Sequence, residues 1–156
     1  MSKLSSLTYK TWAWAAIRIP LLFFARPRIL ELDDEHCVVE LRLRRRTRNH
    51  LGSMYFGALA IGADTAGGLI AFETIRARKA NVSLIFKDFH AEFLQRAEGD
   101  VHFTCRDGAA IRELVDRVIA SGERETLPVK VVATVPSVSN EPVAEFTLGL
   151  SLKRRD

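Results

Sequence analysis

Cysteine is scarce in this chain, and no pattern of residues suggests a bound metal. The 156 residues include 2 cysteines, Cys37 and Cys105, which lie far apart and form no CxxC. Cysteines without such spacing predict neither a disulfide framework nor a zinc site. We expect both to be small, buried, reduced side chains. The 4 histidines have no ligand spacing either, so we expect neither a metal nor a cofactor.

A clean membrane-spanning run is also lacking near the start of the chain. Residues 12–25 are apolar, but Arg18 and Pro20 interrupt them, and the stretch is shorter than the ~20 residues that cross a bilayer. A signal peptide would need an uninterrupted apolar core and a small-residue cleavage site. We therefore expect a cytoplasmic protein without integral membrane association. This stretch would be a helix packed on its own domain, or alternatively a helix lying on a membrane surface.

Motifs for nucleic-acid binding are absent as well. The net charge of +4 is only mildly basic, and the sequence has no zinc-finger spacing, RNP-like aromatic strand or helix-turn-helix pattern. We expect no nucleic-acid partner. A phosphorylated small molecule suits the charge equally well.

Arginine is concentrated in one short segment, since five of the seven residues from Arg42 to Arg48 are arginine. The simplest interpretation is a solvent-exposed strand face and loop. The alternative is a clamp for ligand phosphates, because the forked donors of arginine suit phosphate oxygens. Arg76, Arg78 and Lys79 are competing candidates for the same role.

The composition and the hydrophobic periodicity predict one α+β domain. Of the residues, 47% are hydrophobic and 27% charged, as in an ordinary globular protein. Without an internal repeat or linker, we expect a single domain over residues 1–156, with residues 1–27 as an N-terminal helical extension. Periodicity predicts helices over 9–24, 57–75 and 107–121, and strands over 28–32, 37–44, 83–93, 98–106, 126–135 and 143–152. Five or six antiparallel strands wrapped around one apolar helix would result.

The predicted helix from Gly57 to Ile75 is the most informative segment. Between Gly57 and Phe72 its only polar residues are Asp64 and Thr65, and a helix that is apolar on all sides is a buried helix. It contains four glycines, each of which costs about 1 kcal/mol relative to alanine in a helix interior. Their presence suggests that backbone or ligand comes close to the helix.

Asp64 needs an explanation, because an isolated ionised carboxylate in apolar surroundings costs several kcal/mol. It could accept hydrogen bonds from backbone or a buried arginine and be structural, or it could line a cavity and act as a base or nucleophile. The residues alone favour neither. The loop over 49–57 favours function, because it leads to a helix N-terminus whose free N–H groups suit an anion or an oxyanion. A carboxylate two turns along would then lie near the reacting carbon.

Residues 49–68, NHLGSMYFGALAIGADTAGG, resemble the signature of the hot-dog acyl-CoA thioesterase superfamily. Asn49 matches the family's Asn, Gly57 matches the second Gly of its His-Gly-Gly, and Asp64 falls at its catalytic carboxylate. Residues 93–97 are similar to the segment that closes the family's third strand. The resemblance covers roughly residues 28–152 and is to an uncharacterised, domain-of-unknown-function branch that often carries an N-terminal helix.

The resemblance implies a hot-dog fold, a homodimer formed by joining two sheets, and acyl-thioester sites at the dimer interface, with a tetramer as a further possibility. Asp64 would activate water or attack the thioester, Asn49 would orient substrate or water, and the N–H groups of Phe56 and Gly57 would hold the oxyanion. His50, beside Asn49, and the basic cluster Arg76, Arg78 and Lys79 would bind the coenzyme A thioester, which is the substrate and not a cofactor.

The sequence departs from the family pattern at two positions. The family's His is Tyr55 here, and its first Gly is Phe56, so the imidazole is lost while the backbone N–H remains. Tyr55 would either donate a hydrogen bond or form part of the wall of the substrate tunnel. In some members a strand Ser or Thr assists the carboxylate, and Phe86 stands in that place here. Ser83 lies earlier on the same strand and is the candidate there for binding the substrate. The main hypothesis is thioester hydrolysis; the alternative is a non-catalytic acyl-CoA or lipid-binding protein, and hydratase chemistry is weaker because it lacks a well-placed His.

Overall fold

The computed structural model describes residues 3–155 and begins with two helices, α1 (Lys3–Arg18) and α2 (Pro20–Ala25). They meet at Ile19, whose backbone is not helical (φ −140°, ψ 76°). The residue before a proline disfavours the helical conformation, whereas Pro20 itself suits the first position of the next helix. The single helix predicted over 9–24 is therefore two helices with a break at Ile19.

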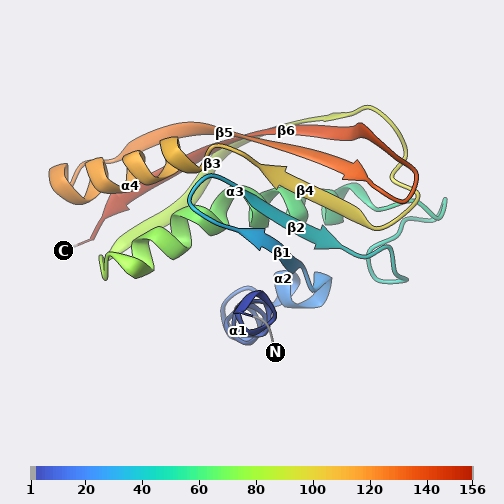
Figure 1. Ribbon diagram of the computed structural model, residues 1–156, viewed down its shortest axis with the longest axis horizontal. Coiled ribbons are helices and arrows are strands. Elements are labelled where there is room, and N and C mark those ends of the chain that lie inside the picture. Colours follow the sequence, from blue (N-terminus) through green and yellow to red (C-terminus); the bar gives the residue numbers. More distant parts are fainter. Residues whose placement is uncertain (1–2, 156) are drawn as a thin grey trace.

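Six antiparallel strands form one sheet in the order β1-β2-β4-β5-β6-β3 (Figure 1). The strands are β1 (Arg28–Leu32), β2 (Cys37–Leu41), β3 (Val82–Phe93), β4 (Val101–Cys105), β5 (Glu125–Val135) and β6 (Ser139–Arg154). The long strand β3 lies at one edge, next to β6. The prediction that β2 extends to Arg44 is wrong. The N–H of Leu43 donates to Asp100 Oδ1 at 2.8 Å instead of to a neighbouring strand.

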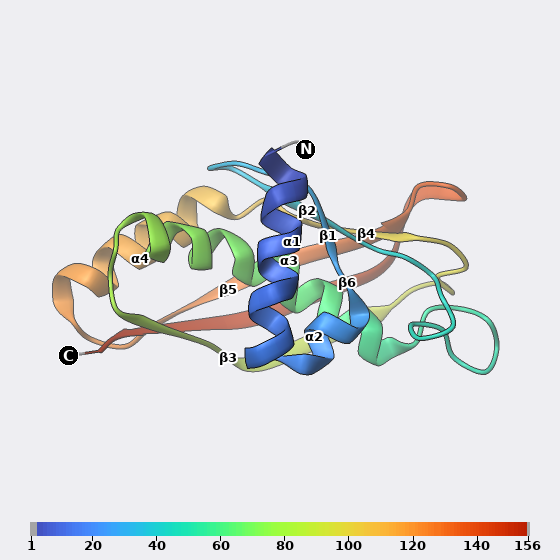
Figure 2. The same cartoon turned by 90° about the horizontal axis from the view of Figure 1, so that it is seen from below.

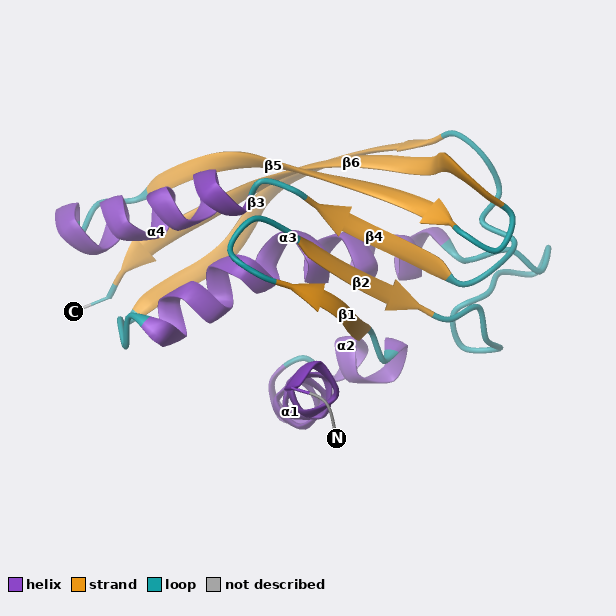
Figure 3. Cartoon of the chain, viewed as in Figure 1, coloured by secondary structure: helices purple, strands orange, loops and turns teal. Residues whose placement is uncertain are grey.

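The helix α3 (Phe56–Ala77) lies against the concave face of this sheet, which confirms the predicted α+β arrangement of a sheet wrapped around one central helix (Figure 3). α3 is the one helix within residues 3–155 that is long and apolar enough to span a membrane, and 61% of its apolar stretch is buried inside the fold. Packing against the sheet accounts for that apolar character, as expected of a core helix.

Close packing between α3 and the sheet depends on a glycine. The ring of Phe103 on β4 is fully buried, and a Cβ atom added at Gly62 would lie only 2.2 Å from it. Real Cβ atoms do not approach that closely, so Gly62 gives the aromatic ring the space that a side chain would occupy. This is one of the close approaches that the glycines of this segment predict.

The helix α4 (Gly108–Ser121) packs against α3 and the strands β5 and β6. It buries one stripe at helical spacing, formed by Ile111, Leu114, Val115 and Val118. It ends at Gly122, whose φ of +76° places it in the left-handed region that glycine adopts readily. The predicted helix over 107–121 is confirmed.

Cys37 and Cys105 are free and buried, as expected. They lie directly opposite each other on β2 and β4. Burial raises the pKa of both thiols, to about 11 for Cys105. Such thiols stay protonated near neutral pH and pack as small apolar side chains.

The N-terminal helices pack on their own chain, and α1 crosses α3 on the side away from the sheet (Figure 2). The Trp12 Nε1 donates to the carbonyl oxygen of Pro27 at 2.6 Å, and Thr8 Oγ1 accepts from the N–H of Ile29 at 3.0 Å. The Trp14 ring contacts Phe72 of α3, with ring centroids 5.3 Å apart. The extension is thus part of the fold, although several apolar side chains along its outer side remain exposed: Ile17, Leu21 and Phe24.

Candidate functional site

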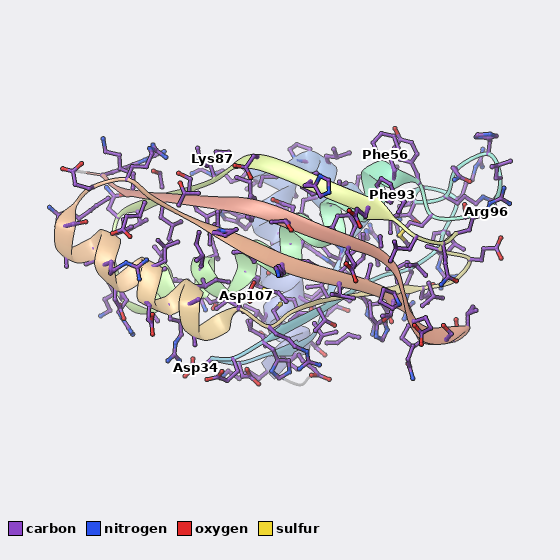
Figure 4. The ribbon with its side chains drawn as sticks, turned by 90° about the horizontal axis from the view of Figure 1, so that it is seen from above. Asp34, Phe56, Lys87, Phe93, Arg96 and Asp107 are labelled. Atoms are coloured by element: carbon purple, nitrogen blue, oxygen red, sulfur yellow. The ribbon has the colours of Figure 1, made fainter. Side chains whose placement is uncertain are left out.

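Asp64 lies on the side of α3 that faces the edge strand β3. Eight residues before it, the Phe56 ring contacts that of Phe93 at the end of β3, with centroids 6.4 Å apart (Figure 4). Four residues after it, a Cβ atom at Gly68 would lie 3.5 Å from the Phe86 ring on β3. Because residues four apart occupy the same side of a helix, Asp64 lies between these two contacts.

α3 is exposed at Asp64, so the expectation that the helix is buried on all sides is wrong. Two helical turns before and after it, Phe56 is 60% exposed and Phe72 is 39% exposed. The reason is the strand order. β3 has a neighbour on one side only, so the sheet ends beside α3 and cannot close around it.

No group within residues 3–155 hydrogen-bonds or ion-pairs with the Asp64 carboxylate. Thr65, the next residue, has a hydrogen-bond partner within the helix, since its Oγ1 donates to the Ile61 carbonyl at 2.7 Å. Water reaches the Asp64 carboxylate, but the surrounding protein desolvates it enough to raise its pKa to about 6. The structural explanation for Asp64, a carboxylate bonded within its own chain, is therefore wrong.

The start of α3 offers two free backbone donors. The carbonyl of Tyr55 accepts from the N–H groups of Ala58 and Leu59 at 2.9 and 3.1 Å. The preceding N–H groups, those of Phe56 and Gly57, have no acceptor in the described part of the chain. Free N–H groups at the positive end of a helix dipole are suited to an anion or a developing oxyanion.

These donors and Asp64 of the same chain cannot act on the same carbonyl group. At 1.5 Å per residue, Phe56 and Gly57 are about 10–12 Å from Asp64 along the axis of α3. A base and an oxyanion donor must both lie roughly 3 Å from the reacting atoms. The expectation that a carboxylate two turns along lies near the same reacting carbon is thus wrong within a single chain, because seven to eight residues of helix separate the two groups.

Tyr55 lies over the helix start. Its ring centroid is 4.8 Å from that of Phe56, and its Cε1 would be 2.5 Å from a Cβ atom at Gly57. Gly57 therefore leaves room for the tyrosine ring, which is 49% exposed. Tyr55 replaces the family's imidazole with an aromatic wall beside the two free N–H groups.

Asn49 and His50 lie in the loop before α3, together with two arginines. The side chain of Asn49 holds this loop, since Oδ1 accepts from the Leu51 N–H at 2.9 Å and Nδ2 donates to Ser53 Oγ at 3.0 Å. Asn49 and His50 line a cavity of about 640 Å³ that opens to solvent and is completed by Arg45, Arg48, Leu51 and Gly52. The structure brings these residues together with each other and not with Asp64.

Four further candidates lie elsewhere. Ser83 is at the start of β3, where its Oγ donates to the Lys153 carbonyl at 3.1 Å; ten residues of strand, roughly 33 Å, separate it from Phe93. Arg76, Arg78 and Lys79 follow Asp64 by 12 to 15 residues, or about 18–22 Å of helix. Arg76 pairs with Glu73, and Arg78 pairs with Asp116 at 2.9 Å, an interaction that raises the pKa of Arg78 and lowers that of Asp116.

Sequence reasoning missed the exposed aromatic residues that β3 contributes beside Asp64. Phe89 and Phe93 are 45% and 51% exposed, and both rings contact the buried Phe146. Their spacing from Phe86 is not a strict alternation, because the strand register shifts between Phe86 and Phe89. The high aromatic content of the predicted strand indicates these residues, whereas the alternation of apolar and polar residues expected of a strand does not.

No cluster of three or more His, Cys, Asp or Glu side chains in the described chain could hold a metal ion. The absence of a metal and of a cofactor stays a prediction from the sequence.

The sequence matches the profile of a family described as a domain of unknown function (DUF4442) over residues 11–150. No curated protein matches it. Among solved structures, it is similar to a candidate thioesterase from Shewanella oneidensis, with a TM-score of 0.78 and 17% identity over 99% of this chain and 100% of that chain. It is similar to a Pseudomonas aeruginosa protein of unknown function named a probable thioesterase, with a TM-score of 0.76 and 23% identity over 95% and 96% of the two chains. It is also similar to a thioesterase from Haemophilus influenzae, with a TM-score of 0.69 and 14% identity over 99% of this chain and 92% of that chain.

At these identities the structural similarity shows a common fold. The similarity covers nearly the whole length of both chains, and the predicted hot-dog fold is confirmed. The family profile covers most of the chain, including the N-terminal helix from residue 11 onward. The chain belongs to the DUF4442 family and has the hot-dog fold.

Proposed function

We propose that the protein hydrolyses acyl thioesters, with Asp64 as its base or nucleophile. The observation that carries the proposal is an unpartnered carboxylate with a pKa of about 6 in apolar surroundings. A carboxylate poised near the working pH is suited to proton transfer. The structural relatives named as thioesterases support the same activity.

The surroundings of Asp64 suit an apolar acyl chain. Exposed aromatic side chains lie on both elements: Phe56 and Phe72 on α3, two turns before and after Asp64, and Phe89 and Phe93 on β3. Exposed apolar side chains gathered in one region mark a site for an apolar ligand or partner. We infer that the acyl chain lies along these rings while its thioester reaches the carboxylate.

We further propose that the working unit is a homodimer joined through β3. This 12-residue strand has an unpaired edge, and an exposed edge with apolar side chains is a template for pairing with another chain. Antiparallel pairing of two copies about a twofold axis near Ala60 would bring the Phe56 and Gly57 N–H groups of one chain toward Asp64 of the other. Each site would then contain a carboxylate and an oxyanion hole that one chain alone keeps about 10–12 Å apart.

The reaction in such a site is a simple hydrolysis. The Asp64 carboxylate takes a proton from water, and the water oxygen attacks the thioester carbonyl carbon. The Phe56 and Gly57 N–H groups hold the oxyanion. As the carbonyl re-forms, the C–S bond breaks and the leaving thiolate takes the proton from Asp64, which yields a carboxylic acid and a thiol. We propose that this occurs in the cytoplasm, in one domain over residues 1–156, without a metal or cofactor and with a coenzyme A or carrier-linked thioester as substrate.

Release of free thiol from a panel of acyl-CoA thioesters tests this function. We expect turnover by the wild-type protein and a loss of at least a hundredfold in Asp64→Asn, because the amide can neither take a proton nor attack. Glu113→Gln is the control, since Glu113 is an exposed carboxylate on α4, away from the edge of β3. Equal activity in wild type and Asp64→Asn would remove Asp64 from the reaction.

The second candidate is a non-catalytic acyl-CoA or lipid-binding protein. Tyr55 favours it, because its ring lies over Gly57 and against Phe56, where a thioester carbonyl would have to approach. Binding of acyl-CoA without thiol release, in the wild type and in Tyr55→Ala alike, would establish this alternative. Thiol release by the wild type would reject it.

A further inference from the structure

The densest positive charge of the molecule lies on one ordered loop between β2 and α3. Arg44, Arg45, Arg46 and Arg48 are all exposed, and none of them forms an ion pair with a residue in the range 3–155. Arg96 is exposed at the same end of the molecule (Figure 4). Uncompensated like charges repel one another, so this arrangement favours an anionic ligand.

Two carboxylates near this loop, Glu40 and Asp100, already have partners. Glu40 accepts from Arg28 at 2.8 Å and from Arg42 at 3.2 Å. Asp100 accepts the N–H of Leu43. Glu98 lines a separate cavity of about 240 Å³ with Arg96. Arg45 and Arg48 line the other cavity, of about 640 Å³, which opens to solvent.

The loop is fixed in shape by hydrogen bonds to buried groups. Thr47 is 1% exposed, and its Oγ1 donates to the Arg42 carbonyl at 2.7 Å and accepts from the Arg44 N–H at 2.9 Å. The Met54 N–H donates to the Ala97 carbonyl at 2.9 Å. Gly52 closes the tip with a φ of +85°, a conformation that favours glycine. The backbone that carries Arg45 and Arg48 therefore has its shape before a ligand binds, so ordering that backbone adds little to the entropy cost of binding.

The position of the loop relates it to the proposed active site. Four residue steps separate Gly52 from Phe56, so the cavity lies within about 15 Å of the free N–H groups at the start of α3. A carrier whose thioester lies at the helix start can therefore extend its polar end toward Arg45 and Arg48. Arginine suits phosphate oxygens in this role, because its planar donors bind two oxygens at once.

We propose that this cavity is a phosphate site, in which Arg45 and Arg48 bind the phosphates of the group that carries the acyl chain; the proposal rests on the thioesterase function proposed above. Two carriers share this chemistry. One is coenzyme A, with a diphosphate and a 3′-phosphate on its nucleotide, and the other is the phosphopantetheine arm of a carrier protein, with one phosphate.

Calorimetric titration of the full chain tests the site without turnover. The probes are coenzyme A, 3′,5′-ADP, 4′-phosphopantetheine and pantetheine, which has no phosphate. We expect Arg45→Gln/Arg48→Gln to weaken coenzyme A binding at least tenfold and to leave pantetheine binding unchanged. If the variant also binds 3′,5′-ADP more weakly, the site binds the nucleotide of coenzyme A. If it binds 4′-phosphopantetheine more weakly, the site binds the phosphate that both carriers share.

The matched control is Arg106→Gln/Lys130→Gln, which changes two exposed basic residues outside the loop. Both double variants lower the net charge equally, from +4 to +4 − 2 = +2. Equal weakening by both pairs would show a general charge effect and overturn the site, as would an unchanged affinity for coenzyme A in Arg45→Gln/Arg48→Gln. Melting temperatures within a few degrees of wild type verify that each variant is folded.

Turnover of two substrates separates this proposal from the thioesterase function. We expect the loop variant to raise KM for acyl-CoA and to leave kcat/KM for the matching acyl-pantetheine unchanged. If the wild-type protein hydrolyses neither substrate, the thioesterase function is rejected. The calorimetric titration then still decides whether the cavity binds phosphate. Equal losses on both substrates would overturn the phosphate site and leave hydrolysis standing.

Discussion

The rings of Phe56 and Phe93 meet edge to face with their centroids 6.4 Å apart, and this contact joins the first residue of α3 to the last residue of β3. Both rings are more than half exposed. They belong to the two elements, α3 and β3, that a second copy would contact in the proposed dimer. The partner chain would therefore cover both rings.

Phe93→Asp should break the dimer. It places a charge where the partner chain would exclude water, and an unpaired buried charge costs several kcal/mol. We expect sedimentation to show half the wild-type mass at a concentration where the wild type is dimeric, together with loss of thiol release. Val138→Asp is the control, because Val138 is 71% exposed in the turn between β5 and β6. A Phe93→Asp protein with wild-type mass would place the interface elsewhere.

Gly62→Ala should destabilise the fold. The new Cβ atom would lie 2.2 Å from the Phe103 ring, and overpacking of this kind costs about 1–3 kcal/mol. Gly67→Ala is the matched substitution on the same helix, where the nearest atom is an ordinary 3.4 Å away. It should be neutral or stabilising by up to about 1 kcal/mol, because alanine favours a helix more than glycine does. Urea unfolding measures both, and equal stabilities would contradict the packing described for Phe103.

The rate of hydrolysis should depend on the ionisation of Asp64. Only the ionised form can take a proton from water, and its pKa is about 6. We expect kcat/KM to rise with pH, to reach half its maximum near pH 6 and to level off above pH 7. The residual rate of Asp64→Asn should lack this step. A wild-type profile that is flat between pH 4.5 and 7.5 would assign the proton transfer to another group.

The ionisation of Asp64 that raises the rate of hydrolysis should lower the stability of the folded protein. The pKa of Asp64 is raised in the folded state, from 3.8 to about 6, so between pH 4 and 6 the folded protein holds more of this proton than the unfolded chain. The contribution of Asp64 to stability therefore falls as pH rises through this window. Asn resembles the protonated acid, so Asp64→Asn should melt above the wild type at pH 7, with the difference vanishing near pH 4. Melting curves at the two pH values measure it.

The elements that the sequence predicted well depend on local patterns. The helix α4 follows from one apolar stripe that ends in Gly122, and β1 from a short apolar run between a proline and an Asp-Asp turn. The end of β2 was missed, whereas the break at Ile19 follows from Pro20 itself, because the sequence predicts a helix at least up to that proline. In β2, the N–H of Leu43 leaves the sheet for Asp100, a residue 57 positions away, and nothing near Leu43 in the sequence indicates that partner.

The candidate site was predicted in its residues and less well in its geometry. Asp64 was singled out by its chemistry alone, as the one charged residue between Gly57 and Phe72. Its exposure depends on β3 lying at the edge of the sheet, which no local pattern contains. Asn49 matched a motif, yet its side chain is engaged with Leu51 and Ser53, and Arg78 is engaged with Asp116 on another helix.

The claim that each site combines Asp64 of one chain with the helix start of another can be tested by mixing two inactive variants. Asp64→Asn lacks the carboxylate. Gly57→Pro lacks one oxyanion donor, since proline is tolerated in a first helical turn, and it is combined with Tyr55→Ala because the Tyr55 ring would otherwise meet the new side chain. After the two proteins exchange subunits, half of the dimers should be mixed, and each mixed dimer should contain one intact site. We expect thiol release to recover to about a quarter of the wild-type rate. A mixture that stays as inactive as its components would contradict a shared site and confine the chemistry to a single chain.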